Sequence, residues 1–187
     1  MSQEIIQVRW HGRGGQGAIT AAKIVANAAF QAGYLGVVMA PSFGTERRGA
    51  PVNTSLKLSR TKINDISPIE APDMVVVLDH LILDEEDVTA GLKPGGLLVL
   101  NTPKSPDKYP FSDFRVAVAD VTSIATQVGL RRGIVNSGII GALAKASDLL
   151  ELDLLLKHIE LEFEGRRPKE NAEAAKKTYE NTLFGAN

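Results

Sequence analysis

Near its start the chain reads Val8-Arg9-Trp10-His11-Gly12-Arg13-Gly14-Gly15-Gln16-Gly17, a glycine-rich run between two different patterns. Apolar residues before the run predict a β-strand over residues 5–10, and alanine-rich residues at helical spacing predict a helix over residues 15–32. Glycine lets the backbone approach a ligand closely, and the first N–H groups of a helix have no partner within it. The run therefore predicts a phosphate-binding corner.

The pattern G-x-G-x-x-G of dinucleotide-binding loops is met by Gly12, Gly14 and Gly17. Such loops are accompanied by an acidic residue about 20 residues further on, which binds the ribose hydroxyls. The second predicted strand, residues 36–40, ends without an acid, and this weakens an interpretation as a NAD or FAD site. A turn needed only for strand–helix packing is the simpler alternative. Arg13 and Gln16 favour contact with an anion or an amide, because a plain turn needs neither.

A second segment follows that strand and reads Pro41-Ser42-Phe43-Gly44-Thr45-Glu46-Arg47-Arg48-Gly49-Ala50-Pro51. In a doubly wound sheet it leaves from the same carboxyl edge as the glycine run. Arg47 and Arg48 offer planar, bidentate donors for phosphate or carboxylate, and Glu46 is placed to orient one of them. An exposed charged loop is the alternative. Proline and glycine on both sides constrain the segment, which favours a functional or interface role.

A third segment, residues 131–142, has small residues at Gly138, Gly141 and Ala142, which allow close helix packing. Asn136 stands near the expected helix start, where either a ligand contact or a backbone contact is open to it. The pair Asp79-His80 follows an apolar strand, but no serine or second base completes an acid–base site. We therefore assign this pair a structural role.

Strand-like and helix-like segments alternate along the chain. Strands are predicted over residues 5–10, 36–40, 52–58, 74–78, 97–100 and 114–119, and helices over 15–32, 84–90, from Asp120 or Thr122 to 128, and over 134–149, 152–163 and 169–183. Polar and apolar residues alternate over residues 52–58, which predicts a half-buried, antiparallel strand. We predict one domain over residues 1–187 with an α/β fold. It is a Rossmann-like, doubly wound, mostly parallel sheet with helices on both faces and a helical C-terminal part over about 134–187.

Composition excludes several classes of function. A net charge of −1 over 187 residues gives no general attraction to nucleic acid or to an anionic membrane, so we expect neither as a partner. The sequence contains no cysteine, which removes disulfides, Fe–S ligation and thiol catalysis. Its three histidines lack metal-ligand spacing, so no metal site is expected. Without a signal peptide or an apolar run of roughly 20 residues, a soluble cytoplasmic protein is expected.

The first two motifs together resemble the gamma subunits of 2-oxoacid:ferredoxin oxidoreductases. The likeness includes Thr20-Ala21-Ala22-Lys23 after the first motif, and Asn136 with Gly141-Ala142-Leu143 resembles a weaker third block. It extends over nearly the whole chain. It implies a subunit without catalytic residues of its own, which covers the active site and helps to bind coenzyme A (CoA). The implied cofactor-binding residues are Gly12, Arg13, Gly14, Gly15, Gln16, Gly17, Phe43, Gly44, Glu46, Arg47, Arg48 and Asn136.

The resemblance also implies a multi-subunit enzyme. Such enzymes convert a 2-oxoacid and CoA to an acyl-CoA and CO2, and they pass two electrons to ferredoxin. Thiamine diphosphate with Mg2+ is held between the alpha and beta subunits, and 4Fe-4S clusters lie in the beta subunit and in a ferredoxin-like delta subunit. This chain would ligate none of them and would be inactive alone. Its motifs look more like those of pyruvate and branched-chain enzymes than those of 2-oxoglutarate enzymes.

A different class of function remains as the alternative. The chain would then be a stand-alone, Rossmann-like nucleotide-binding module or an NAD(P)-dependent oxidoreductase. The missing acid at the end of residues 36–40 counts against this alternative.

Overall fold

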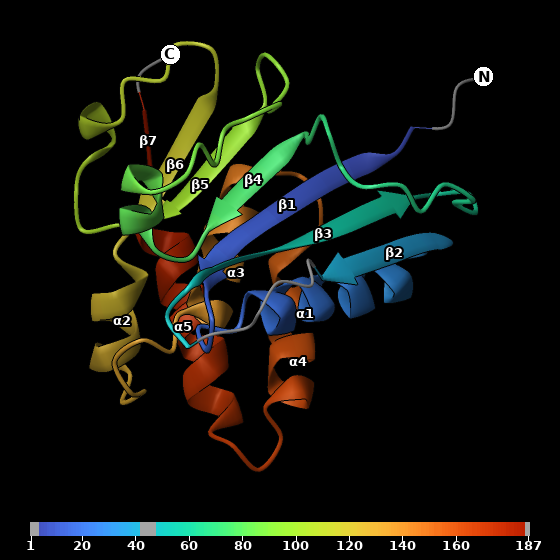
Figure 1. Cartoon of the computed structure of the whole chain (residues 1–187). Helices are drawn as coiled ribbons and strands as arrows, with labels where there is room; N and C mark the ends of the chain where they lie inside the picture. Colours follow the sequence, from blue (N-terminus) through green and yellow to red (C-terminus); the bar gives the residue numbers. More distant parts are fainter. Residues whose placement is uncertain (1–3, 42–47, 186–187) are drawn as a thin grey trace.

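The computed structural model describes residues 4–41 and 48–185. Within these residues the chain forms a seven-stranded sheet with the order β2-β3-β1-β4-β5-β6-β7 (Figure 1). The strands are β1 (Ile6–Arg13), β2 (Gly36–Pro41), β3 (Pro51–Ser59), β4 (Met74–Val77), β5 (Leu97–Asn101), β6 (Arg115–Ala119) and β7 (Leu183–Phe184). The α/β class predicted from the sequence is confirmed.

The sheet is mostly parallel. Strands β1, β4, β5 and β6 are parallel neighbours. Strand β3 runs antiparallel to both β1 and β2, so β2 points the same way as β1, and β7 runs antiparallel to β6. The antiparallel strand expected at residues 52–58 is therefore present as β3. Because β1 pairs with β3 as far as Arg13, it extends three residues beyond its predicted end.

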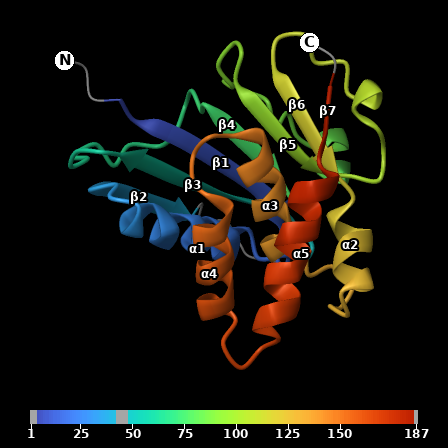
Figure 2. The ribbon, with the colours of Figure 1, turned by 180° about the vertical axis from the view of Figure 1, so that it is seen from behind.

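Helices α1 (Ala18–Gln31) and α3 (Asn136–Ala146) lie against one face of the sheet, and α4 (Leu152–Glu162) and α5 (Pro168–Asn181) pack on these two helices, as Figure 2 shows from behind. The short helix α2 (Val121–Gln127) contacts α3 and α5. Trp10, Leu56 and Val99 point from the sheet into this layer, where they join one apolar core with the helices. Most of the buried apolar side chains belong to this core.

The second face of the sheet has a thinner cover. Val75, Leu98 and Val116 lie there against the 3-10 helix η1 (His80–Asp84) and the turns and loops around it. Helices were predicted on both faces, but in the described part of the chain the α-helices lie on the first face, and the second face carries the 3-10 helix η1 and turns, because the connection from β4 to β5 forms only short turns. This cover matters for the site, because η1 starts where β4 ends.

Two local predictions need correction. The helix expected at residues 84–90 is wrong: the chain forms η1 and then turns, because Asp79 caps η1 and Asp87 bonds the backbone and hydroxyl of Thr89. The helix expected from residue 15 starts at Ala18. A second 3-10 helix, η2 (Pro106–Lys108), lies between β5 and β6. Of the two caps considered for α2, Asp120 is the one used, since its carboxylate accepts the Ser123 N–H at 3.0 Å.

Small residues bring α3 and α5 together, as predicted. A Cβ on Gly141 would lie 1.9 Å from the carbonyl oxygen of Ala175 in α5, and a Cβ on Gly138 would lie 3.2 Å from the Thr178 hydroxyl of α5 and 2.3 Å from the Val121 side chain of α2. Only glycine allows this approach of the two helices. No helix in the described part of the chain has the length and apolar character needed to cross a membrane.

Candidate functional site

The glycine-rich loop lies at the carboxyl ends of β1 and β4. From β1 the chain passes through α1 to one side of the sheet, and it later returns to the other side as β4. In open α/β sheets such a reversal leaves a crevice where ligands bind. The loop is also joined to the end of the second motif: the Gly14 N–H donates to the Ala50 carbonyl at 2.9 Å, and the Gly49 N–H donates to the Gly14 carbonyl at 3.1 Å.

The backbone of the loop needs its glycines. Gly15 and Gly17 have φ angles of 93° and 84°, a region that side chains disfavour. Gly17 is the N-cap of α1, and no side chain caps this helix or places an acid in its first turn. Among the described residues, no atom comes within 4 Å of a Cβ placed on Gly15, so none of them covers the backbone on that side. This arrangement suits an anion next to the loop.

The guanidinium of Arg13 is not free to meet a ligand. Its Nε donates to the Asp79 carboxylate at 2.8 Å, its Nη2 donates to Glu85 at 2.5 Å, and its Nη1 reaches the Gly49 carbonyl at 3.2 Å. The hydrogen bonds with Glu85 and Asp79 raise the pKa of the guanidinium. Arg13 therefore fastens the glycine loop both to η1 and to the second motif.

The sequence pointed only to a general structural role for Asp79. In the structure, its carboxylate holds the glycine loop. Its carboxylate accepts from Arg13, from the Leu81 N–H at 3.0 Å and, at 3.5 Å, from Gln16. Burial acts to raise the pKa of this carboxyl, but the hydrogen bonds from Arg13, Leu81 and Gln16 outweigh it, so the pKa lies below its ordinary value. A contact between Asp79 and the loop could have been predicted from its position directly after β4, because β4 and β1 end at the same edge of the sheet.

Gln16 closes the loop on itself. Its Oε1 accepts the Arg13 N–H at 2.8 Å, while the Gln16 N–H donates to the Arg13 carbonyl at 2.9 Å. A Cβ on Gly12 would lie 3.3 Å from the Cβ of Ala18, which leaves little room between the strand and the helix. Gly12 and Gln16 thus fix the shape of the turn.

Asn136, from the third segment, lies against the loop. A Cβ placed on Gly17 would be 2.6 Å from the Asn136 Nδ2. The Asn136 Oδ1 accepts the Ser137 N–H at 3.1 Å, and the side chain is 7% exposed. The structure therefore brings the first and third motifs into contact, although they are far apart in the sequence.

The second motif is described only in part. Arg48 is exposed, and Gly49 and Ala50 contact the glycine loop as given above. The other predicted contact residues of this motif lie outside the described residues; they are Phe43, Gly44, Glu46 and Arg47.

Two polar side chains of β1 lie beneath the turns after η1. Arg9 donates to the carbonyls of Val88 and Ala90 at 3.0 and 2.6 Å, and its Nε donates to the His11 Nε2 at 3.1 Å. The His11 Nδ1 has no hydrogen-bond partner among the described residues, and the Glu86 carboxylate is 3.8 Å from it. Burial first and the charge of Arg9 second lower the pKa of His11 to about 4. We therefore take His11 as a neutral, structural residue.

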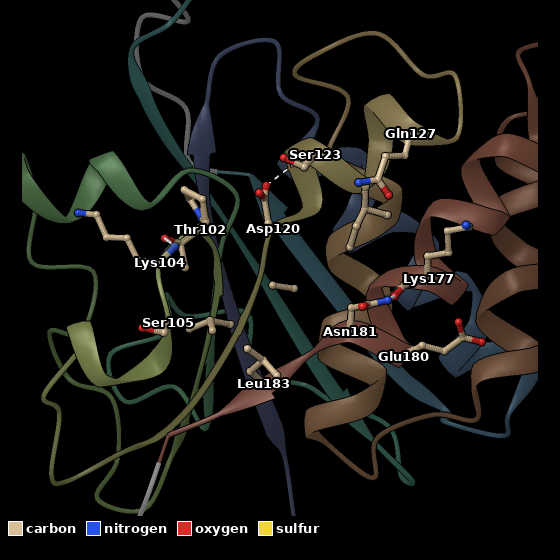
Figure 3. A pocket seen from close by; sticks show the side chains of 14 residues that line it. Thr102, Lys104, Ser105, Asp120, Ser123, Gln127, Lys177, Glu180, Asn181 and Leu183 are labelled. Carbon is tan, nitrogen blue, oxygen red and sulfur yellow. Dashed lines mark hydrogen bonds between the residues drawn. The ribbon is translucent and has the colours of Figure 1, made fainter.

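A separate hollow of 470 Å³ lies further along the carboxyl edge, between the ends of β5 and β6 and helix α5 (Figure 3). Lys104 and Asp120 follow the two strands, and Lys177 and Glu180 come from α5. Opposite charges are therefore mixed in its lining, and none of the predicted cofactor-binding residues is part of it. Of the predicted residues that the structure describes, Gly12 to Gly17 and Asn136 lie together at the end of β1 and the start of α3 instead.

Comparison with known proteins gives the same family that the sequence motifs resemble. The family model for pyruvate ferredoxin/flavodoxin oxidoreductase matches residues 7–181. A pyruvate/ketoisovalerate oxidoreductases common subunit gamma from Pyrococcus furiosus is 44% identical over 182 residues, which cover 95% of this chain and 97% of that protein. A pyruvate synthase subunit PorC from Methanothermobacter thermautotrophicus is 44% identical, over 94% of this chain and 95% of that protein.

Solved structures show the same arrangement. The pyruvate oxidoreductase subunit PORC of Thermotoga maritima superposes with a TM-score of 0.83 at 33% identity, covering 99% of this chain and 100% of that one. The fold also recurs, at 20% identity and a TM-score of 0.76, within the 2-oxoglutarate:ferredoxin oxidoreductase of Magnetococcus marinus; the match covers 96% of this chain and 32% of that one. The chain belongs to the pyruvate ferredoxin/flavodoxin oxidoreductase family and groups with its gamma subunits.

Proposed function

We propose that this chain is the gamma subunit of a complex that oxidatively decarboxylates a 2-oxoacid, with pyruvate as the foremost candidate. The products are an acyl-CoA, CO2 and reduced ferredoxin. The observation that carries the proposal is the match along nearly the entire chain to gamma subunits named for pyruvate and ketoisovalerate. The first two motifs have the form expected for those substrates rather than for 2-oxoglutarate.

Within the complex, we assign this chain the role of covering the active site and helping to bind CoA. No described residue covers the Gly15 backbone, Gly17 is the N-cap of α1 and has no side chain to cap it, and Asn136 lies beside Gly17. These features fit one phosphate group of the CoA pyrophosphate. Arg13 serves to hold the loop, because Asp79 and Glu85 occupy its guanidinium. Arg48, exposed at the rim, is the described arginine placed to meet a ligand phosphate or an acidic partner.

The remaining chemistry belongs to partner subunits in this proposal. CoA, when bound, accepts the acyl group as a thioester. Thiamine diphosphate with Mg2+ and the 4Fe-4S clusters are assigned to the alpha, beta and delta chains, since a chain without cysteine offers no thiolate ligands for such clusters. Ferredoxin takes the electrons from the complex. We place the assembled complex in the cytoplasm.

The first experiment is an anaerobic pull-down of the tagged chain from its own host. The eluate is assayed for CoA-dependent viologen reduction with pyruvate, 2-oxoisovalerate, 2-oxoglutarate and indolepyruvate. We expect partner chains that contain iron and thiamine, and the highest rate with pyruvate. A lone, colourless and inactive chain, under conditions that preserve such complexes, contradicts the proposal. Tight binding of NADH to that chain would then favour the stand-alone nucleotide-binding module.

A second experiment tests the contribution of the loop to CoA binding. In the assembled complex, Arg48→Gln should raise the Michaelis constant for CoA about tenfold, because a charge-assisted hydrogen bond to phosphate is worth about 1.5–3 kcal/mol. The Michaelis constant for the 2-oxoacid should not change. Arg115→Gln, at an exposed arginine on β6, is the matched control. Equal CoA constants in both variants would support a scaffold role for this rim.

A further inference from the structure

A second charged region lies away from the glycine loop, where the loop after α2 meets the loop after α4. The Arg167 Nη1 donates to the Gly129 carbonyl at 2.6 Å and joins the two loops. Between them is a hollow of 670 Å³, within the size range of small-molecule sites. Its lining consists of Gly129, Leu130, Arg131, Ile134, Phe163, Gly165, Arg166, Arg167 and Asn171.

The charged side chains that line this hollow are all positive. Arg131, Arg166 and Arg167 line it, and its lining contains no aspartate or glutamate. Within the described part of the chain, none of the three arginines forms an ion pair with a carboxylate. The Arg131 side chain also makes no hydrogen bond there, so its planar donors remain available. Three such guanidinium groups around one hollow favour an anionic ligand.

The arginines are held in place by the fold. The Asn171 side chain is 2% exposed and donates to the carbonyls of Arg166 at 3.3 Å and Arg167 at 2.9 Å. Its Oδ1 accepts the Ser137 hydroxyl at 2.8 Å. Arg167 has a φ of 58°, and it is the non-glycine residue with positive φ in the described chain. That conformation costs about 1–2 kcal/mol, so the buried amide of Asn171 maintains a strained loop.

The floor of the hollow is apolar. Leu130 and Phe163 are buried there, and the Arg166 guanidinium lies 5.4 Å from the centre of the Phe163 ring. A ligand must therefore combine an anionic group with a flat or apolar body. Guanidinium groups bind phosphate in a bidentate manner and stack on aromatic planes.

We propose that this hollow binds a nucleotide, in which a sugar carries both a phosphate monoester and a heterocyclic base. The phosphate pairs with Arg131 and Arg167, and the base packs over Leu130 and Phe163. This site shares no residue with the glycine loop and does not depend on the function proposed above. Its link to that loop is indirect: Asn171 bonds Ser137, and the neighbouring Asn136 lies against Gly17.

Titration calorimetry on the full-length chain tests the proposal, with AMP as the probe. Adenosine and inorganic phosphate are the partial ligands, and both should bind at least tenfold more weakly than AMP. Arg131→Gln should weaken AMP binding about tenfold, the loss expected when one charge-assisted phosphate contact is removed. Arg131→Lys keeps the charge but loses the planar pair of donors, so its affinity for AMP should lie between those of the unaltered chain and Arg131→Gln. Arg115→Gln should bind AMP as the unaltered chain does.

Several results would overturn the site. These are no heat with AMP at millimolar concentration, equal affinity for AMP and adenosine, or equal affinity of the Arg131→Gln and Arg115→Gln variants. Thermal melts of each variant establish that it is folded. Competition identifies the natural source: displacement of AMP by CoA assigns the site to the phosphorylated adenosine end of CoA, and retention of AMP assigns it to a free nucleotide. Either result of the competition upholds the site.

Discussion

At the scale of single residues, two arginines of β1 hold the segment that follows β4. Arg9, His11 and Arg13 alternate along β1 on the face that η1 and its turns cover. Arg9 bonds two carbonyls of the turns, and Arg13 bonds Asp79 and Glu85. Arg13 and Asp79 are half-buried, and each charge is neutralised by the other. The glycine loop is therefore positioned by polar contacts on the thinner side of the sheet.

His11 makes the stability of the chain depend on pH. Its pKa is lowered from 6.5 to about 4, because burial and the nearby Arg9 disfavour the charged form. Below pH 6.5 the unfolded chain binds a proton that the folded chain does not take up until about pH 4. Stability should thus fall as the pH falls across this window, by about 3 kcal/mol in all. Glu86, at 3.8 Å, does not compensate for burial.

Urea unfolding at pH 7, 5.5 and 4.5 measures this loss. His11→Gln should remove most of the pH dependence, since glutamine does not titrate and can still accept from Arg9. His80→Gln, at a half-buried histidine after β4, should keep the dependence and serves as the control. An equal slope of stability against pH in all three proteins would contradict the role of His11.

At the scale of elements, the hydrophobic pattern decides the secondary structure in some segments, and local side-chain hydrogen bonds decide it in others. The alternation at residues 52–58 predicted an antiparallel strand because burial of one face dominates there, and β3 has this form. The prediction failed at residues 84–90, where Asp79 and Asp87 bond the backbone and favour 3-10 and turn structure over an α-helix. Strand β7 was missed because two exposed residues carry no periodicity.

The close approach of α3 and α5 is the second element-scale feature. Gly141→Ala would place a Cβ 1.9 Å from the Ala175 carbonyl oxygen, which lies in a helix backbone and cannot move aside. Overpacking of this kind costs about 1–3 kcal/mol, more than the gain in helix propensity from glycine to alanine. Thermal melting should show a lower Tm. Gly185→Ala is the matched control, because its nearest contact would be an ordinary 3.6 Å. A Tm equal to that of the control would show that the helices can separate freely.

At the scale of the whole molecule, the order of elements fixes where the predicted site residues meet. The strand order places the glycine loop at the carboxyl end of β1, where the order reverses between β1 and β4, and the start of α3 brings Asn136 to the same place. The sequence allowed the first of these to be predicted from strand–helix alternation. It did not reveal the contact between Gly17 and Asn136, or the bonds from Asp79 to the loop, because these depend on tertiary packing of segments distant in the chain.

The whole-molecule prediction is that the purified chain alone oxidises no 2-oxoacid. Loss of CO2 from a 2-oxoacid leaves a carbanion that needs an electron sink, and two electrons must then leave through redox centres. This chain has no cysteine for Fe–S clusters, and its glycine loop offers backbone groups suited to binding rather than to electron transfer. Viologen reduction with pyruvate and CoA should therefore equal the buffer rate for the isolated chain. It should appear when the partner chains are added under anaerobic conditions. CoA-dependent turnover by the isolated chain, with its purity confirmed by mass spectrometry, would show that it holds a redox site of its own.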